Sequence, residues 1–155
     1  MQNIEIDQEF QSLIPQLSLD ERQQLEANIK SDGCRDPLVM WNGILIDGHN
    51  RYEICSRLGI SFTTVEKQFN DRSYVVEWII KNQFGRRNLN DFQRGELALR
   101  MKPIIEARAL ERKRGGQGGI LLSEKSHEAK KRTDEVLGEM AGLSSNTIRK
   151  VESLN

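Results

Sequence analysis

The chain has 155 residues, enough for one ordinary domain or for a small domain with a helical extension. Apolar residues make up 37 % of it and charged residues 30 %, and no apolar run approaches the roughly 18 residues of a membrane span. The N-terminus, MQNIEIDQEF, lacks the basic and apolar segments of a signal peptide, so we expect a cytoplasmic protein that does not enter a membrane.

The charge is divided unevenly, although its total is zero. Residues 1–80 contain 7 Lys/Arg against 13 Asp/Glu, a net charge of −6, and residues 81–155 contain 16 against 10, a net charge of +6. This asymmetry predicts an acidic body joined to a basic part that binds a polyanion such as nucleic acid. The alternative is that the basic helices are rich in Lys and Arg for solubility alone.

The first segment with clear signals is a helix over residues 17–33. Ser18 and Glu21 form an S-x-x-E capping box at its start, and Gly33 can close its end. Two apolar runs, PLVMW and ILI, then flank Asn42-Gly43. This dipeptide is typical of a two-residue type I′ turn, so we predict a β-hairpin.

Three further elements follow the hairpin. The pattern predicts a short helix that ends at Gly59, a strand over residues 60–69 with alternating and β-branched side chains, and a helix over residues 71–84. We expect the first of these helices to direct Ile54, Cys55 and Leu58 toward the core. The second should direct Val75, Trp78 and Ile79 toward the core. Cys34 and Cys55 have no CxxC spacing, which argues against a disulfide framework or a zinc site and favours reduced thiols.

The second half of the chain is predicted to be helical. Asn90 can cap a helix together with Gln93, and Pro103 should split that helix near residues 101–102. The GGQGG segment lacks the G-K-[ST] ending of a phosphate-binding loop and is interpreted as a linker. The predicted organisation is an α+β domain over 1–80, a helical middle segment over 81–114, the linker over 115–119 and a helical tail over 120–155.

The corner between the hairpin and the next helix can bind an anion. Gly48 allows close approach of the backbone, the helix N-terminus offers N–H groups, and Arg51 adds a forked cation. His49 can donate a hydrogen bond or take a proton. The residues alone leave a plain alternative open, in which Asp47 caps the helix, Gly48 makes the turn and Arg51 is solvated.

The order of a helix, PLVMWNGILIDGHNR, a second helix and a strand resembles the ParB/sulfiredoxin superfamily, and in particular the N-terminal domain of ParB-type proteins. The resemblance implies a small mixed sheet with helices and a bound nucleoside triphosphate, CTP or ATP, with Mg2+. The segment KNQFGRRNLN resembles a second phosphate-binding segment of the family. The matching positions for nucleotide or phosphate binding are Gly48, His49, Asn50, Arg51, Asn82, Arg86 and Arg87.

The residues at the corner also depart from the family. ParB proteins usually have Gly-Glu-Arg-Arg there, and sulfiredoxins place a nucleophilic cysteine where this chain has His49. Sulfinic acid repair is therefore not expected. Free-serine kinases on the same fold have Asp-Gly-His-His-Arg, a closer match, which keeps a nucleotide-dependent kinase or a nuclease open as the alternative. The weak catalytic candidates for this enzyme alternative are His49 and Glu9. We expect no metal cluster, because Asp47 and Glu53 are isolated carboxylates.

The tail predicts a helix-turn-helix, although an ordinary α-hairpin is the alternative. Leu137, Ala141, Leu143, Ile148 and Val151 have core spacing, and Gly142 allows a tight turn. Polar and basic side chains remain for phosphates and base edges. The candidate DNA-binding residues are Lys130, Lys131, Arg132, Ser144, Ser145, Asn146, Thr147, Arg149 and Lys150.

Together these features predict a DNA-binding protein of partition or transcription-regulator type, from a plasmid, phage or other mobile element. A bound polyphosphate, neutralised by Arg51, Arg86 and Arg87, would reposition the helical half. We expect self-association on DNA, since a single recognition helix binds weakly. ParB proteins continue beyond this point into further helices and a dimerisation domain, so a reduced or truncated relative is expected.

Overall fold

The structure is a computed structural model that describes residues 3–86, 89–114 and 124–154, with backbone alone at 124–129 and 131. The chain forms two compact units, Met1–Ile79 and Ile80–Asn155. Within the described ranges, no helix combines the length and the apolar character that crossing a membrane requires.

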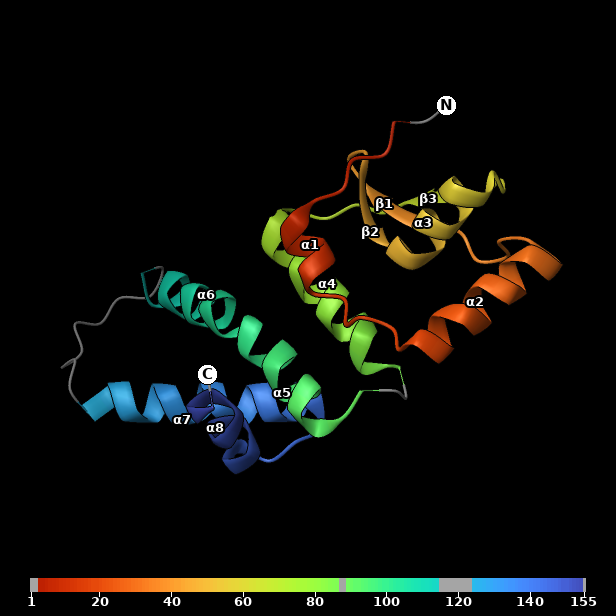
Figure 1. Cartoon of the computed structure of the whole chain (residues 1–155). Coiled ribbons are helices and arrows are strands. Elements are labelled where there is room, and N and C mark those ends of the chain that lie inside the picture. Colours follow the sequence, from red (N-terminus) through yellow and green to blue (C-terminus); the bar gives the residue numbers. More distant parts are fainter. Residues whose placement is uncertain (1–2, 87–88, 115–123, 155) are drawn as a thin grey trace. The chain divides into compact units, whose positions relative to one another are not determined.

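The first unit contains a three-stranded mixed sheet, which confirms the predicted α+β class (Figure 1). Its order is β2-β1-β3, with β1 (Leu38–Trp41) antiparallel to β2 (Ile44–Asp47) and parallel to β3 (Thr64–Glu66). Asn42 and Gly43 have φ values of 48° and 80°, as a type I′ turn requires, so the predicted hairpin is confirmed. The strand predicted over 60–69 is only three residues long, because β1, its only partner in the sheet, ends at the turn.

Four helices begin in the first unit: α1 (Gln8–Ser12), α2 (Leu19–Asp32), α3 (His49–Leu58) and α4 (Arg72–Phe84). The capping box of α2 is confirmed, because Ser18 Oγ accepts from the Glu21 amide at 3.2 Å and Glu21 Oε1 accepts from the Ser18 amide at 3.2 Å. Gly33 and Gly59 end α2 and α3, as predicted. Helix α1 was not predicted from the sequence.

The core of the first unit joins the sheet to α3, and α3 to α2. Leu38, Met40 and Leu45 form one buried cluster, and Ile29, Ile54 and Cys55 form another. Phe62 packs against both clusters. Its ring meets the ring of Tyr52 edge-on, with centroids 5.8 Å apart. The inward positions predicted for α3 are therefore confirmed.

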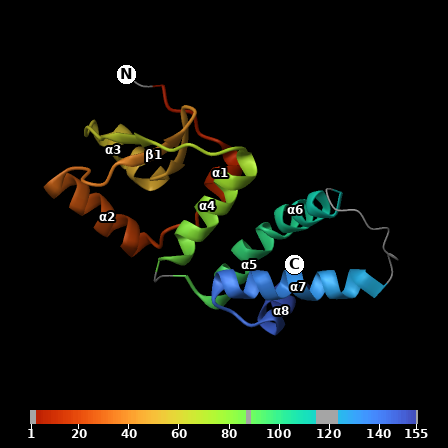
Figure 2. The same ribbon diagram turned by 180° about the vertical axis from the view of Figure 1, so that it is seen from behind.

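The second unit is helical and contains α5 (Asp91–Arg100), α6 (Lys102–Arg114), α7 (Glu124–Ala141) and α8 (Ser145–Ser153) (Figure 2). Asn90 and Gln93 form the predicted capping box. The predicted break also occurs: α5 ends at Arg100, three residues before Pro103, whose ring would clash with the preceding turn. The GGQGG segment lies outside the described residues.

Helices α5, α7 and α8 pack against one another, so the predicted middle segment and tail share one core (Figures 1 and 2). Gly95 of α5 permits close approach to α8, because a Cβ atom there would lie 2.7 Å from Val151 Cγ2. The tail residues predicted to be inward are buried, with Leu143 half-buried: Leu137, Ala141, Ile148 and Val151.

The turn between α7 and α8 is a Schellman-type ending followed by a cap. Gly142 has a φ of 70°, and the Leu143 amide donates to the Gly138 carbonyl at 2.7 Å. Ser144 Oγ then accepts from the Thr147 amide at 3.2 Å and starts α8. Because the chain folds back over Gly138, a Cβ atom at this position would lie 2.5 Å from the Leu143 carbonyl oxygen.

We predict that Gly138→Ala destabilises the second unit, although alanine is the better helix former by about 1 kcal/mol. The collision is with backbone, which cannot rotate away, so the free energy of unfolding should fall by about 1–3 kcal/mol. Chemical denaturation followed by circular dichroism would measure this. Glu135→Ala, on the exposed face of the same helix, is the matched control and should change stability by less than about 0.5 kcal/mol.

Candidate functional site

Helix α3 begins at the corner after β2, and no side-chain hydrogen bond caps its first turn. Gly48 is the N-cap residue, with a φ of 100°, and no side-chain hydrogen bond caps α3. The alternative in which Asp47 caps this helix is therefore wrong. An uncapped N-terminus directs backbone N–H groups and the positive end of the helix dipole outward, which suits an anion.

Arg51 is not solvated, contrary to that same alternative. Its side chain is 18 % exposed, with Nη2 3.3 Å from the Pro37 carbonyl oxygen and 3.5 Å from Asp47 Oδ2. The guanidinium folds back over Gly48, where a Cβ atom would come within 2.9 Å of Nη2 and 2.5 Å of Leu38 Cδ2. Arg51 therefore ties the corner together, besides any contact that it makes to a ligand.

The burial of the His49 side chain at the corner was not expected from the sequence. It is 8 % exposed, and neither ring nitrogen has a hydrogen-bond partner. Burial lowers the pKa of the imidazole, and the nearby Asp47 carboxylate opposes this only in part. The ring is therefore neutral at neutral pH, with one donor and one acceptor available to a ligand.

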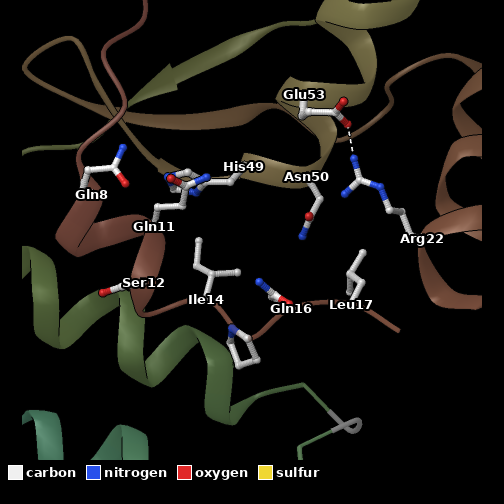
Figure 3. Close-up of a pocket in the computed structure, with 11 residues that line it drawn as sticks. Gln8, Gln11, Ser12, Ile14, Gln16, Leu17, Arg22, His49, Asn50 and Glu53 are labelled. Atoms are coloured by element: carbon white, nitrogen blue, oxygen red, sulfur yellow. Dashed lines mark hydrogen bonds and ion pairs between the residues drawn. The ribbon is translucent and has the colours of Figure 1, made fainter. Parts of the chain in front are cut away.

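The His49 side chain borders a pocket of about 670 Å³ that lies within the first unit (Figure 3). Side-chain amides dominate its polar lining, and its two charged residues, Arg22 and Glu53, are paired with each other. The walls come from α1, the α1–α2 connection, α2 and the start of α3. The lining residues are Gln8, Gln11, Ser12, Ile14, Pro15, Gln16, Leu17, Arg22, His49, Asn50 and Glu53.

Arg72 of α4 holds α1 in place as one wall of the pocket. Its Nη2 lies 2.7 Å from Asp7 Oδ1 and its Nε 3.6 Å from Glu9 Oε1, while its guanidinium lies over the Phe10 ring at 4.3 Å. Arg72 also lowers the pKa of Asp7, the N-cap of α1. Glu9, a weak catalytic candidate, pairs with Arg72 and does not line the pocket.

The opposite wall is held by an ion-pair network between α2 and α3. Arg57 contacts Glu26 at 2.9 Å and Glu53 at 3.0 Å, and Glu53 also pairs with Arg22. Arg57 lowers the pKa of Glu26 below its usual range. Because water reaches these groups and screens their charges, each pair contributes little stability. Their main effect is to place Glu53 and Arg22 at the pocket.

The second predicted phosphate-binding segment belongs mainly to the other unit. Asn82 in α4 and Arg86 just after it are half-buried, and Arg87 lies outside the described residues. Their part in phosphate binding stays a prediction. Among the described residues, no group of three or more His, Cys, Asp and Glu side chains could hold a metal ion.

The predicted DNA-binding residues lie on α7 and α8. Lys130, Arg132, Ser144, Asn146, Arg149 and Lys150 are exposed, Ser145 and Thr147 are half-buried, and the side chain of Lys131 lies outside the described residues. One feature was not expected: Arg149 Nε donates to Oδ2 of the buried Asp134 at 3.0 Å.

Sequence reasoning missed the α1 wall of the pocket. Asp7, three residues before Phe10, was the local signal, since its Oδ1 accepts from the Phe10 amide at 3.1 Å and starts α1. No local signal was available for the pairing of Arg72 with Asp7, since 65 residues separate them.

The fold resembles that of two solved ParB domains. A crystal form of a Pnob8-like ParB-N domain matches with a TM-score of 0.68 and 21 % identity, over 96 % of this chain and 64 % of that one. A pNOB8-like ParB N-domain matches with a TM-score of 0.62 and 23 % identity, over 96 % and 60 %. This chain thus has a ParB N-domain-like fold and spans less than two thirds of those structures. No family model and no curated protein matches the sequence.

We predict that His49 makes the protein less stable in mild acid. Its pKa in the folded state lies below the usual 6.5, so the unfolded chain binds the proton more readily once the pH falls below that value. The free energy of unfolding should therefore decline from pH 7.5 to pH 5, and His49→Gln should reduce the decline. Urea titrations at both pH values would measure it. An equal decline in the two proteins would contradict the burial of a neutral imidazole.

Proposed function

We propose that this chain is a nucleotide-responsive, DNA-binding protein of ParB-like partition or transcription-regulator type, from a plasmid, phage or other mobile element. The observation that carries the proposal is the His49 ring. It is buried, without a hydrogen-bond partner, and borders the pocket beside the uncapped start of α3. Such a group is costly unless a ligand satisfies it.

A nucleoside triphosphate, CTP or ATP with Mg2+, fits the residues around this pocket. The volume of about 670 Å³ lies within the usual range of ligand sites. The backbone N–H groups of α3 suit a phosphate, and the amides of Gln8, Gln11 and Asn50 suit the polar edges of a base or a sugar. Mg2+ would be held mainly by the phosphates of the ligand.

DNA binding is supported by the exposed cations and amides of the second unit. Lys130 and Arg132 on α7 and Lys150 on α8 can contact phosphates, and Asn146 near the start of α8 can contact a base edge. Helices α7 and α8, with their tight turn at Gly142, would then form a helix-turn-helix. One such motif per chain covers one half-site, so we propose that the protein self-associates on DNA.

A second candidate is a nucleotide-dependent enzyme, either a kinase resembling the free-serine kinases or a nuclease. The observation that favours it is again His49, because a buried imidazole with a lowered pKa can act as a general base. Magnesium-dependent turnover that is lost in His49→Gln would favour this reading. Binding without turnover would favour the DNA-binding reading.

We predict that a nucleoside triphosphate raises the melting temperature, and that Asn50→Ala removes this shift. Asn50 lines the pocket at the first turn of α3, and a ligand stabilises only the state that binds it. A thermal-shift screen of the four ribonucleotides, with and without Mg2+, would measure the effect. Ser56→Ala, on an exposed part of the same helix, is the control and should keep the shift. If no nucleotide or polyphosphate shifts the unmodified protein, the pocket proposal is wrong.

We predict that DNA affinity falls steeply with salt and that Lys150→Ala weakens binding to all sequences alike. Each lost phosphate contact should lower the slope of log K against log salt by about 1. Lys30→Ala removes the same charge from α2 and should leave the slope unchanged. Titrations of a labelled random duplex at several salt concentrations would measure both. Equal slopes for Lys150→Ala and the unmodified chain would argue against α8 as the DNA-contacting helix.

A further inference from the structure

Helix α7 contains a buried carboxylate that the features described so far do not explain. Asp134 is fully buried, yet it receives a single described hydrogen bond, from Arg149 Nε to Oδ2 at 3.0 Å. Its other oxygen, Oδ1, is buried without a hydrogen-bond partner. Burying a charge that is only partly satisfied costs free energy, so stability alone is a poor reason for an aspartate at this position.

The charge of Asp134 is balanced from two neighbouring helices. Arg149 of α8 supplies the direct contact. Lys102 of α6 is close enough to interact electrostatically, although its raised pKa is due first to its hydrogen bond with Glu152. Positive charge thus approaches this carboxyl group from two helices, and its clearest geometric effect is on Arg149.

The contact orients an arginine that is itself accessible. The Arg149 side chain is 48 % exposed and lies beside Lys150 on α8. A guanidinium is planar, so a hydrogen bond at Nε restricts the orientation of its plane and leaves its outer edge, which has one N–H from each Nη atom, to donate to another acceptor. Those atoms form the fork that can donate to O6 and N7 of guanine. The carboxylate also offsets the positive charge and thereby weakens the attraction to phosphates, which compete for the same fork.

We propose that Asp134 is a positioning residue that presents the Arg149 fork to a guanine in the major groove. This inference rests on the proposed DNA-binding function of α7 and α8. The alternative is that the Asp134–Arg149 contact only holds α7 and α8 together, as a brace between the two helices. The two roles predict different results. Loss of a brace would lower stability and weaken binding to every sequence, whereas loss of orientation would abolish the preference at one base pair.

The experiment compares Asp134→Asn, Asp134→Leu, Arg149→Ala and the double variant Asp134→Leu/Arg149→Ala with the unmodified full chain. A preferred duplex is first selected from a random library with the unmodified protein. Affinities are then measured for that duplex and for its single-base variants, at two salt concentrations. The unmodified protein should discriminate at one G·C pair by about 5- to 150-fold, the range expected for a bidentate contact.

Asp134→Leu and Arg149→Ala should each reduce that discrimination to about one, and the double variant should match the single ones. Asp134→Asn should keep most of it, because its amide oxygen can still accept from Nε. The salt slope should stay unchanged in all of them, since no phosphate contact is lost. Melting temperatures report separately whether each variant is folded.

Three outcomes would overturn this inference and leave the proposed DNA binding standing. Discrimination kept in a folded Asp134→Leu would mean that Asp134 is only a brace, and discrimination lost equally in Asp134→Asn would mean that the contact at Nε is not what matters. If the unmodified protein binds DNA without any base preference, Arg149 does not read a guanine, although the proposed DNA binding would stand. Absence of DNA binding would instead refute the proposed function, and this inference with it.

Discussion

At Gly48 the backbone turns with a φ of 100° in a space that Leu38 and Arg51 have already filled. A side chain there would be strained and would also collide with both neighbours. The turn from β2 into α3, in which His49 is the first helical residue, and the packing of Arg51 over the corner both require a glycine at this position. The α3 residues that line the pocket, His49, Asn50 and Glu53, follow directly after that glycine.

Local chemistry made much of the fold predictable. Capping boxes at Ser18 and Asn90, the Asn42-Gly43 turn and the break before Pro103 all act within four residues, so a short window of sequence contains the whole cause. Residue types at the corner likewise predicted an anion site, and that site stays a prediction.

The remaining features depend on partners that are distant in sequence. Arg51 contacts Pro37 across 14 residues, Arg149 contacts Asp134 across 15, and Arg72 contacts Asp7 across 65. Nothing near an arginine says which carboxylate or carbonyl the fold will bring to it. His49 and Asp134 share a further property, a buried polar atom without a partner, which becomes visible only once burial is known. Such exceptions mark the places where a structure serves something other than its own stability.

The exposed network on α2 and α3 gives the pocket an internal counter-ion. Glu53 neutralises Arg22 at the pocket and is held in turn by Arg57. An anionic ligand that reached Arg22 would therefore compete with a carboxylate of the protein, and would release Glu53 toward Arg57 and water. Such an exchange costs little because the pairs are solvated. Glu53 thus compensates the charge of Arg22 at the pocket, and under the proposed function an anionic ligand would have to displace it.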